Sequence, residues 1–179
     1  MYKFFLTFLL TFFTLDGDAA TEDYKFENWF GPSLPIYVAK PKKINKSTRL
    51  VVVMHGRKRN AEEYRDQWLQ ASQDLNLFVI VPEFSEENFP EVWGFNYGNI
   101  KTKNLDLIRK DLHAFSAIEP LAVDALKRFK LKSDHWGIYG HGAGAHFVHR
   151  YVLHHPQATH TLAIAANLGW YLSMTDQEW

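Results

Sequence analysis

The sequence predicts a single α/β domain built on a doubly wound, mostly parallel sheet. Short apolar runs alternate with amphipathic helical patterns along the chain, which is the pattern of βαβ units. The 179 residues are 46% hydrophobic and 22% charged, as expected of one globular domain with a substantial core. A glycine-rich turn between a strand and a helix, described below, fits the same class.

Residues 1–19 are predicted to form an export signal that is not part of the domain. Lys3 precedes an uncharged apolar run over residues 4–15, which is shorter than the about 20 residues that span a bilayer. Gly17 and Ala19 supply a small-x-small cleavage pattern. A buried amino-terminal helix remains the alternative. The domain is expected over residues 20–179 of a secreted or periplasmic protein, with no stable membrane span after signal removal.

The first half of the domain contains three predicted strands and one helix. Residues 35–40 and 49–54 form the first two strands, and the second (RLVVVM) is a near-continuous β-branched run typical of a strand covered on both faces. Asn60 followed by Glu63 has the spacing of a capping-box variant and begins a helix to about residue 74. The next buried strand covers 77–81. A long aromatic-rich connection over 84–111 then follows, and such connections are usually functional or disordered.

The second half predicts helix 112–130, strand 135–139, helix 142–154 and strand 161–167. Pro120 is expected to delay or kink the first of these helices. The last strand is apolar on both faces, as an interior strand would be, yet no strand pattern follows it. We expect it to be an exposed edge through which the chain self-associates or binds a complementing carboxy-terminal fragment.

A glycine-rich turn, GHGAG over residues 140–144, joins a predicted strand to a predicted helix. A G-x-S-x-G nucleophile elbow requires this context and carries its serine at the centre, at positive φ. The central residue here is Gly142, which has no side chain. A phosphate cradle is the alternative, but neither G-x-G-x-x-G nor G-x-x-x-x-G-K-[ST] is present.

A second motif, His55-Gly56-Arg57, follows directly after the strand at 49–54. In hydrolases with such an elbow, one oxyanion-hole amide follows the nucleophile and the other comes from a loop at this place. The candidate donors are therefore the backbone amides of Ala143 and Arg57.

The segments that carry both motifs resemble those of secreted α/β-hydrolases of the polyhydroxybutyrate depolymerase and feruloyl esterase type, over about residues 35–175. These segments include LVVVMHG, GFNYGNI, IYGHGAGAHFVHRYVLHHP and AIAANLGWY. The resemblance implies an α/β-hydrolase fold and an exported serine hydrolase that cleaves esters through an acyl-enzyme. It also implies an ester-type small molecule or polymer as substrate, with no cofactor.

The resemblance assigns expected roles to individual residues. Gly142 stands at the nucleophile position, Arg57 and Ala143 match the oxyanion donors, and His55 is expected to shape the oxyanion loop. The remaining candidates lie beside these positions or in the aromatic connection: Gly56, His141, Trp93, Phe95 and Tyr97. The three aromatic residues are expected either to contact substrate or to pack in the core.

The sequence departs from this pattern in two ways. Position 142 has no hydroxyl to form an acyl-enzyme. The triad order is serine, acid, histidine, but the only acids after Gly142 are Asp176 and Glu178, and no histidine follows them. We therefore expect an inactive homologue, truncated after the strand that follows the elbow helix. A ligand-binding pseudoenzyme that uses the aromatic connection, or a nonfunctional truncated product, remains open.

Composition argues against other classes of function. Lysine and arginine together number 20 and balance 20 aspartates and glutamates, so there is no basic field for nucleic acid. The absence of cysteine removes thiol catalysis and cysteine-based metal sites. Histidines are frequent between 141 and 155, but this helix has no acidic residue and no H-E-x-x-H pattern. We therefore expect no metal site.

Overall fold

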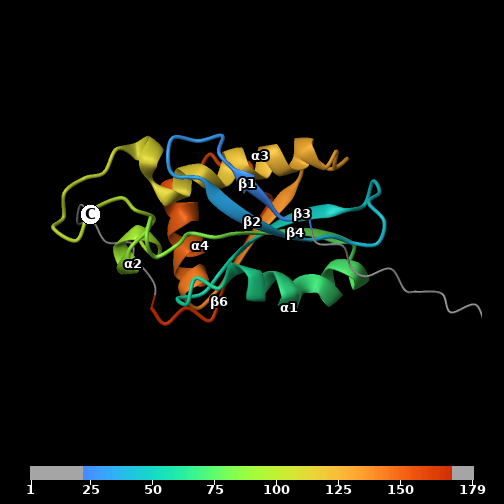
Figure 1. Cartoon of the computed structure of the whole chain (residues 1–179), viewed down its shortest axis with the longest axis horizontal. Helices are drawn as coiled ribbons and strands as arrows, with labels where there is room; N and C mark the ends of the chain where they lie inside the picture. Colours follow the sequence, from blue (N-terminus) through green and yellow to red (C-terminus); the bar gives the residue numbers. More distant parts are fainter. Residues whose placement is uncertain (1–21, 171–179) are drawn as a thin grey trace, which may run out of the picture.

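The computed structural model describes residues 22–170, and the predicted export signal lies outside them. Six strands form one sheet in the order β1-β2-β4-β3-β5-β6 (Figure 1). The strands are β1 (Tyr24–Phe26), β2 (Leu34–Ala39), β3 (Arg49–Met54), β4 (Leu77–Pro82), β5 (Trp136–His141) and β6 (Leu162–Ala166). Over the described range, no helix is long and apolar enough to cross a membrane.

The sheet is mixed, with a parallel part that carries the functional motifs. Strands β4, β3, β5 and β6 pair in parallel, whereas β1 and β2 add an antiparallel edge. This arrangement confirms the predicted α/β class. The sequence analysis missed β1, because it has only three residues and is held by pairing with β2 rather than by an apolar pattern of its own.

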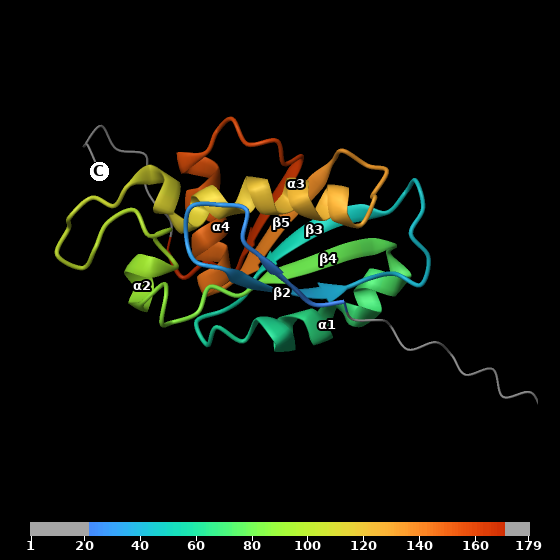
Figure 2. The same cartoon turned by 45° about the horizontal axis from the view of Figure 1, so that its top comes forward.

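Helices cover both faces of the sheet, as a doubly wound fold requires (Figures 1 and 2). The helical segments are α1 (Ala61–Asp74), α2 (Glu91–Gly94), the 3₁₀ turns η1 (Lys110–Leu112) and η2 (Ala114–Ala117), α3 (Ile118–Arg128) and α4 (Ala143–His154). Helix α1 packs on one face with a small apolar cluster, while α3 and α4 bury the main core on the other. Buried β-branched strands between two helical layers explain the long apolar runs in the sequence.

One expectation about helix starts needs correction, and the other, a late start near Pro120, is confirmed. Asn60 makes no capping hydrogen bond to the backbone; its side-chain amide instead donates to the Glu63 carboxylate. Arg59 has positive φ (58°), and its carbonyl accepts the Ala61 N–H, so the chain enters α1 through a tight turn. The helix expected over 112–130 starts late, with 3₁₀ turns before α3 begins at Ile118, which places Pro120 in its first turn, where proline is tolerated.

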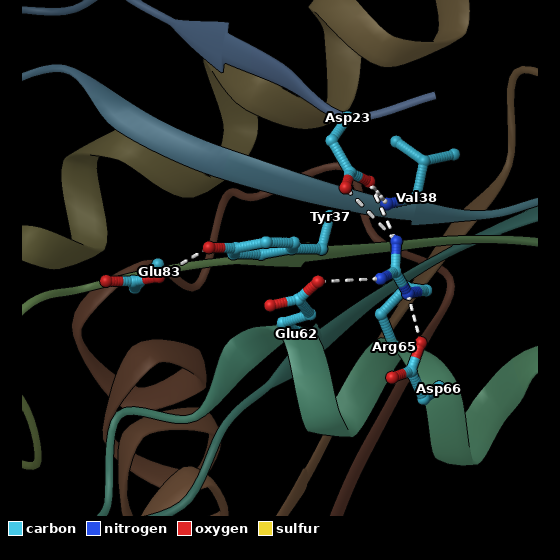
Figure 3. A network of polar contacts seen from close by, with 7 residues as sticks. All are labelled: Asp23, Tyr37, Val38, Glu62, Arg65, Asp66 and Glu83. Carbon is cyan, nitrogen blue, oxygen red and sulfur yellow. Dashed lines mark hydrogen bonds and ion pairs between the residues drawn. The ribbon is translucent and has the colours of Figure 1, made fainter. Parts of the chain in front are cut away.

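Arg65 on α1 is buried, and carboxylates surround its guanidinium (Figure 3). The nitrogens contact Asp23 at 3.0 Å and Glu62 at 3.3 Å, and Asp66 pairs with Nε. The Asp23 carboxylate also accepts the Val38 backbone N–H at 2.9 Å. This network ties the segment before β1 and strand β2 to α1. The buried charge of Arg65 is thus compensated by acidic partners.

Strand β6 lies at one edge of the described sheet, where it pairs only with β5. Its apolar side chains are not covered: Leu162 is 57% exposed and Ile164 is 42% exposed. The apolar edge expected from the sequence is therefore present in the described part of the chain.

Candidate functional site

The turn between β5 and α4 has the backbone of a nucleophile elbow. Gly142 precedes the first residue of α4 and has φ of 57° and ψ of −114°, a combination outside the regions that residues with side chains favour. A Cβ atom built on Gly142 would have no neighbouring atom within 4 Å. The position can therefore hold a side chain that projects into open space above the carboxyl end of the sheet.

The two outer glycines of the motif are sterically required, unlike the central one. A Cβ on Gly140 would lie 2.2 Å from the Gly144 carbonyl oxygen, and a Cβ on Gly144 would lie 2.3 Å from the Met54 carbonyl oxygen. These distances bring α4 into backbone contact with both β5 and the end of β3. The shape of the turn thus comes from Gly140 and Gly144, while residue 142 is free of packing.

The same backbone contact joins the start of α4 to the start of the loop that contains the second candidate oxyanion amide. Gly144 touches the end of β3 immediately before the His55-Gly56-Arg57 loop, and Ala143 is the first residue of α4. The first amides of a helix have no intrahelical acceptor and favour negative charge. The Ala143 amide is next to Gly142 in the chain, and the loop that contains Arg57, whose side chain is exposed, begins where α4 meets the end of β3.

His55 holds the oxyanion loop through two hydrogen bonds. Its Nε2 accepts the Phe84 N–H at 3.0 Å, so Nδ1 carries the proton and donates it to the Gly56 carbonyl at 2.9 Å. Its ring stacks on Phe95 at 4.3 Å. Burial lowers the pKa of His55 to about 3, which keeps the imidazole neutral at physiological pH. These contacts fit a positioning role better than that of a base.

Arg59 links the oxyanion loop to the aromatic connection. Its Nη2 donates to the carbonyls of Phe89 and Glu91, both at 2.9 Å, and its Nε pairs with Glu86 at 3.0 Å. Its guanidinium also lies 4.4 Å from the centre of the Phe95 ring. Arg59 was not predicted as part of the site, because no local pattern in the sequence shows that its side chain reaches residues 27 to 32 positions away.

The aromatic connection divides into a core part and a half-buried part. Phe95 is fully buried, so in this structure it packs in the core and is not available to a ligand. Trp93 and Tyr97 are half-buried and contact each other edge to face at 5.1 Å. Tyr97 also lies 5.9 Å from Trp170, which follows β6. These two residues thus remain candidates for ligand contact.

His141 ends β5 beside the elbow and is exposed. Its Nε2 accepts a hydrogen bond from the Asn167 side chain at 3.2 Å. No carboxylate orients this ring among the contacts of the described residues. Within residues 22–170, no group of three or more histidine, aspartate or glutamate side chains is arranged to hold a metal ion.

Comparison of structures finds solved hydrolases that are similar to this chain, whereas the sequence comparisons find no match. The sequence matches no protein-family model and no curated protein. The fold is similar to poly(aspartic acid) hydrolase-1 from Sphingomonas sp. KT-1, with 36% identity over 87% of this chain and a TM-score of 0.81. It is also similar to LpqC, a poly(3-hydroxybutyrate) depolymerase from Bordetella parapertussis, with 26% identity over 91% of this chain and a TM-score of 0.79. An arylesterase at 18% identity and a TM-score of 0.58 shares the fold.

The sheet order, the elbow and these similarities together define the class: the chain has the α/β-hydrolase fold. Within that class, it is similar to the poly(aspartic acid) hydrolase and the poly(3-hydroxybutyrate) depolymerase named above. The chain spans 59% of the length of the first and 57% of the length of the second.

Proposed function

We propose that this chain is a homologue of exported serine ester hydrolases that keeps an ester-binding frame but lacks the nucleophile. The observation that carries the proposal is Gly142, which has the backbone of a nucleophile elbow and open space where a serine side chain would stand. The expected ligand is an ester-type small molecule or polymer, met in the periplasm or outside the cell. No acyl-enzyme can form at a glycine.

The backbone around Gly142 supports this proposal. In this proposal the amides of Ala143 and Arg57 are the oxyanion donors; Ala143 begins α4 next to Gly142, and the neutral His55 ring holds the loop that leads to Arg57. Backbone donors of this kind stabilise the oxyanion of acyl transfer without a charged side chain. The frame would thus still bind a polarised carbonyl group.

The decisive experiment restores the hydroxyl in a chain that also carries a base. A chimera would append to this chain, from a hydrolase of the same fold, a carboxy-terminal segment that supplies an acid and then a histidine, with Gly142 or with Gly142→Ser. We expect the serine chimera to hydrolyse p-nitrophenyl butyrate about 10³-fold faster or more, since loss of a nucleophile typically costs at least this factor. The present chain should not exceed the buffer rate.

Gly142→Ala in the same chimera is the matched control, since it adds the Cβ without the hydroxyl. Turnover by the glycine or alanine chimera at the serine rate would show that another group is the nucleophile. A serine chimera that is folded and silent would show that the elbow and its amides do not form an ester-binding frame.

We also propose that the exposed edge of β6 mediates self-association or binding of a complementing strand. Apolar edge strands recruit other strands, and a charge on the edge blocks this pairing. We expect light scattering after size-exclusion chromatography to show a dimer or larger species. Ile164→Lys should shift it to monomer, whereas Val123→Lys, at an exposed valine on α3, should not. A stable monomer for the unaltered chain would defeat this proposal.

The alternative of a ligand-binding pseudoenzyme is favoured by the half-buried aromatic pair Trp93 and Tyr97. In this version, saturable binding by the unaltered chain is the function, and catalysis is not required. The inactivated hydrolase and the pseudoenzyme would use the same binding region. They differ in whether Gly142→Ser restores ester hydrolysis.

A further inference from the structure

Arg150 on α4 is a buried cation that has no acidic partner among residues 22–170. Only 3% of the surface of Arg150 is exposed. Within residues 22–170, no carboxylate lies within ion-pair distance of its guanidinium, unlike that of Arg65, which contacts three. Helix α4 contains no acidic residue at all. The carboxylates that compensate the charge of Arg65, the other arginine that is buried, thus have no counterpart at Arg150 among the described residues.

In the described part of the chain, neutral groups make the contacts of the Arg150 guanidinium. Its Nη1 donates to the His146 carbonyl and to His146 Nδ1, both at 3.2 Å, so this imidazole accepts and is neutral. The guanidinium carbon lies 4.8 Å from the centre of the Tyr97 ring and 4.6 Å from that of Trp170. Nη2 is buried and has no hydrogen-bond partner.

An arrangement of this kind costs free energy in the absence of a ligand. A buried charge needs a counter-charge and hydrogen bonds to offset its desolvation. Aromatic faces recover only part of this cost. Burial lowers the pKa of Arg150 and of the neighbouring His146, in keeping with a site that is short of negative charge.

The arginine lies on the same helical face as the elbow. Gly142, His146 and Arg150 are spaced four residues apart, so they follow one another along one side of α4. The His146 N–H donates to the Gly142 carbonyl at 3.1 Å, and the His146 ring lies 4.9 Å from Trp170. Eight residues correspond to about 12 Å along a helix, so an extended ligand can contact both positions.

We propose that Arg150 is a carboxylate-binding site, and that the ligand of the elbow carries a carboxylate about two helical turns from the carbonyl held at Gly142. The second part rests on the proposed function above. Trp170 is 49% exposed and covers the guanidinium, so the carboxylate reaches Nη2 when this ring moves aside. Tyr97 then remains as the fixed face of the site.

A carboxylate suits this site by shape and charge. It is planar and accepts two parallel hydrogen bonds from a guanidinium edge, and the plane of the Arg150 group is fixed by the rings of Tyr97 and Trp170. A single negative charge also matches the single uncompensated positive charge.

Binding of glutarate to the unaltered chain, measured by calorimetry, tests the site directly. We expect saturable binding of glutarate and none of the uncharged glutaramide at the same concentrations. Arg150→Gln should weaken glutarate binding by about tenfold or more, since it removes a charge-assisted hydrogen bond. Arg150→Lys keeps the charge and should retain part of the affinity.

Arg128→Gln is the matched control, because Arg128 also lies over an aromatic ring, that of Tyr24 at 4.4 Å, but is paired with Asp124 at 3.0 Å. This variant should bind glutarate as the unaltered chain does. Equal binding of glutarate and glutaramide, or stronger binding of inorganic phosphate, would overturn the proposal even if no Arg150 variant folds. Because this readout needs no hydrolysis, its failure is distinct from that of the chimera described above.

Discussion

Replacing either outer glycine of the elbow with alanine is expected to lower the free energy of unfolding by about 3 kcal/mol or more. The added Cβ would lie 2.2 Å from backbone at Gly140 and 2.3 Å from backbone at Gly144. Backbone atoms cannot turn aside as a flexible side chain can, so α4 must shift relative to β3 and β5. The gain in helix propensity for alanine at Gly144, about 1 kcal/mol, does not offset this.

Urea unfolding of Gly140→Ala, Gly144→Ala and Gly142→Ala under one set of conditions provides the comparison. Gly142→Ala meets no atom within 4 Å but adopts φ of 57°, which costs about 1–2 kcal/mol for a residue with a side chain. We expect the central variant to be the most stable of the three. If Gly142→Ala were the least stable, the turn would be shaped by its central residue instead.

Acid is expected to destabilise the fold through His55. Its pKa falls from 6.5 to about 3 on folding because of burial, so between these pH values the unfolded state binds more protons. The contribution of His55 to stability is therefore complete above about pH 6.5 and is lost progressively as the pH falls toward 3. The expected loss is on the order of 4 kcal/mol over this interval.

The free energy of unfolding at pH 7, 6, 5 and 4 tests this expectation. His55→Gln cannot titrate and should show a smaller fall over the same pH range, although its stability at pH 7 is lower. His135→Gln, at an exposed histidine on the surface, should follow the unaltered chain. Parallel pH profiles for the unaltered chain and His55→Gln would contradict a neutral His55 in the folded state.

Much of the fold could be predicted from the sequence, because its parallel strands are buried on both faces. The runs at β3 and β4 are apolar throughout, and their bounds differ from the predicted ones by no more than a residue. Helix α4 also lies where the sequence placed it. Strand β1 could not be predicted, because it is held by its partner β2, and the 3₁₀ turns before α3 depend on packing around Phe115.

The candidate site could be predicted only where it is local in sequence. The elbow at Gly142 and the loop at His55 are short motifs on strand ends, so their position follows from the order of the elements. Phe95 could not be assigned from sequence, because a buried aromatic and a ligand-binding one have the same residue type. Arg150 was missed because its aromatic partners, Tyr97 and Trp170, come from distant parts of the chain.

The outer glycines shape the elbow, whereas residue 142 has no packing role, so the residue at position 142 can be exchanged. Since Gly140 and Gly144 fix the turn through contacts with neighbouring backbone, the fold does not depend on which group stands between them. A lineage with this scaffold can lose its nucleophile without losing its architecture. For the same reason, serine, cysteine or aspartate introduced at 142 would meet a preformed turn, so this chain is a suitable starting scaffold for installing new reactive groups.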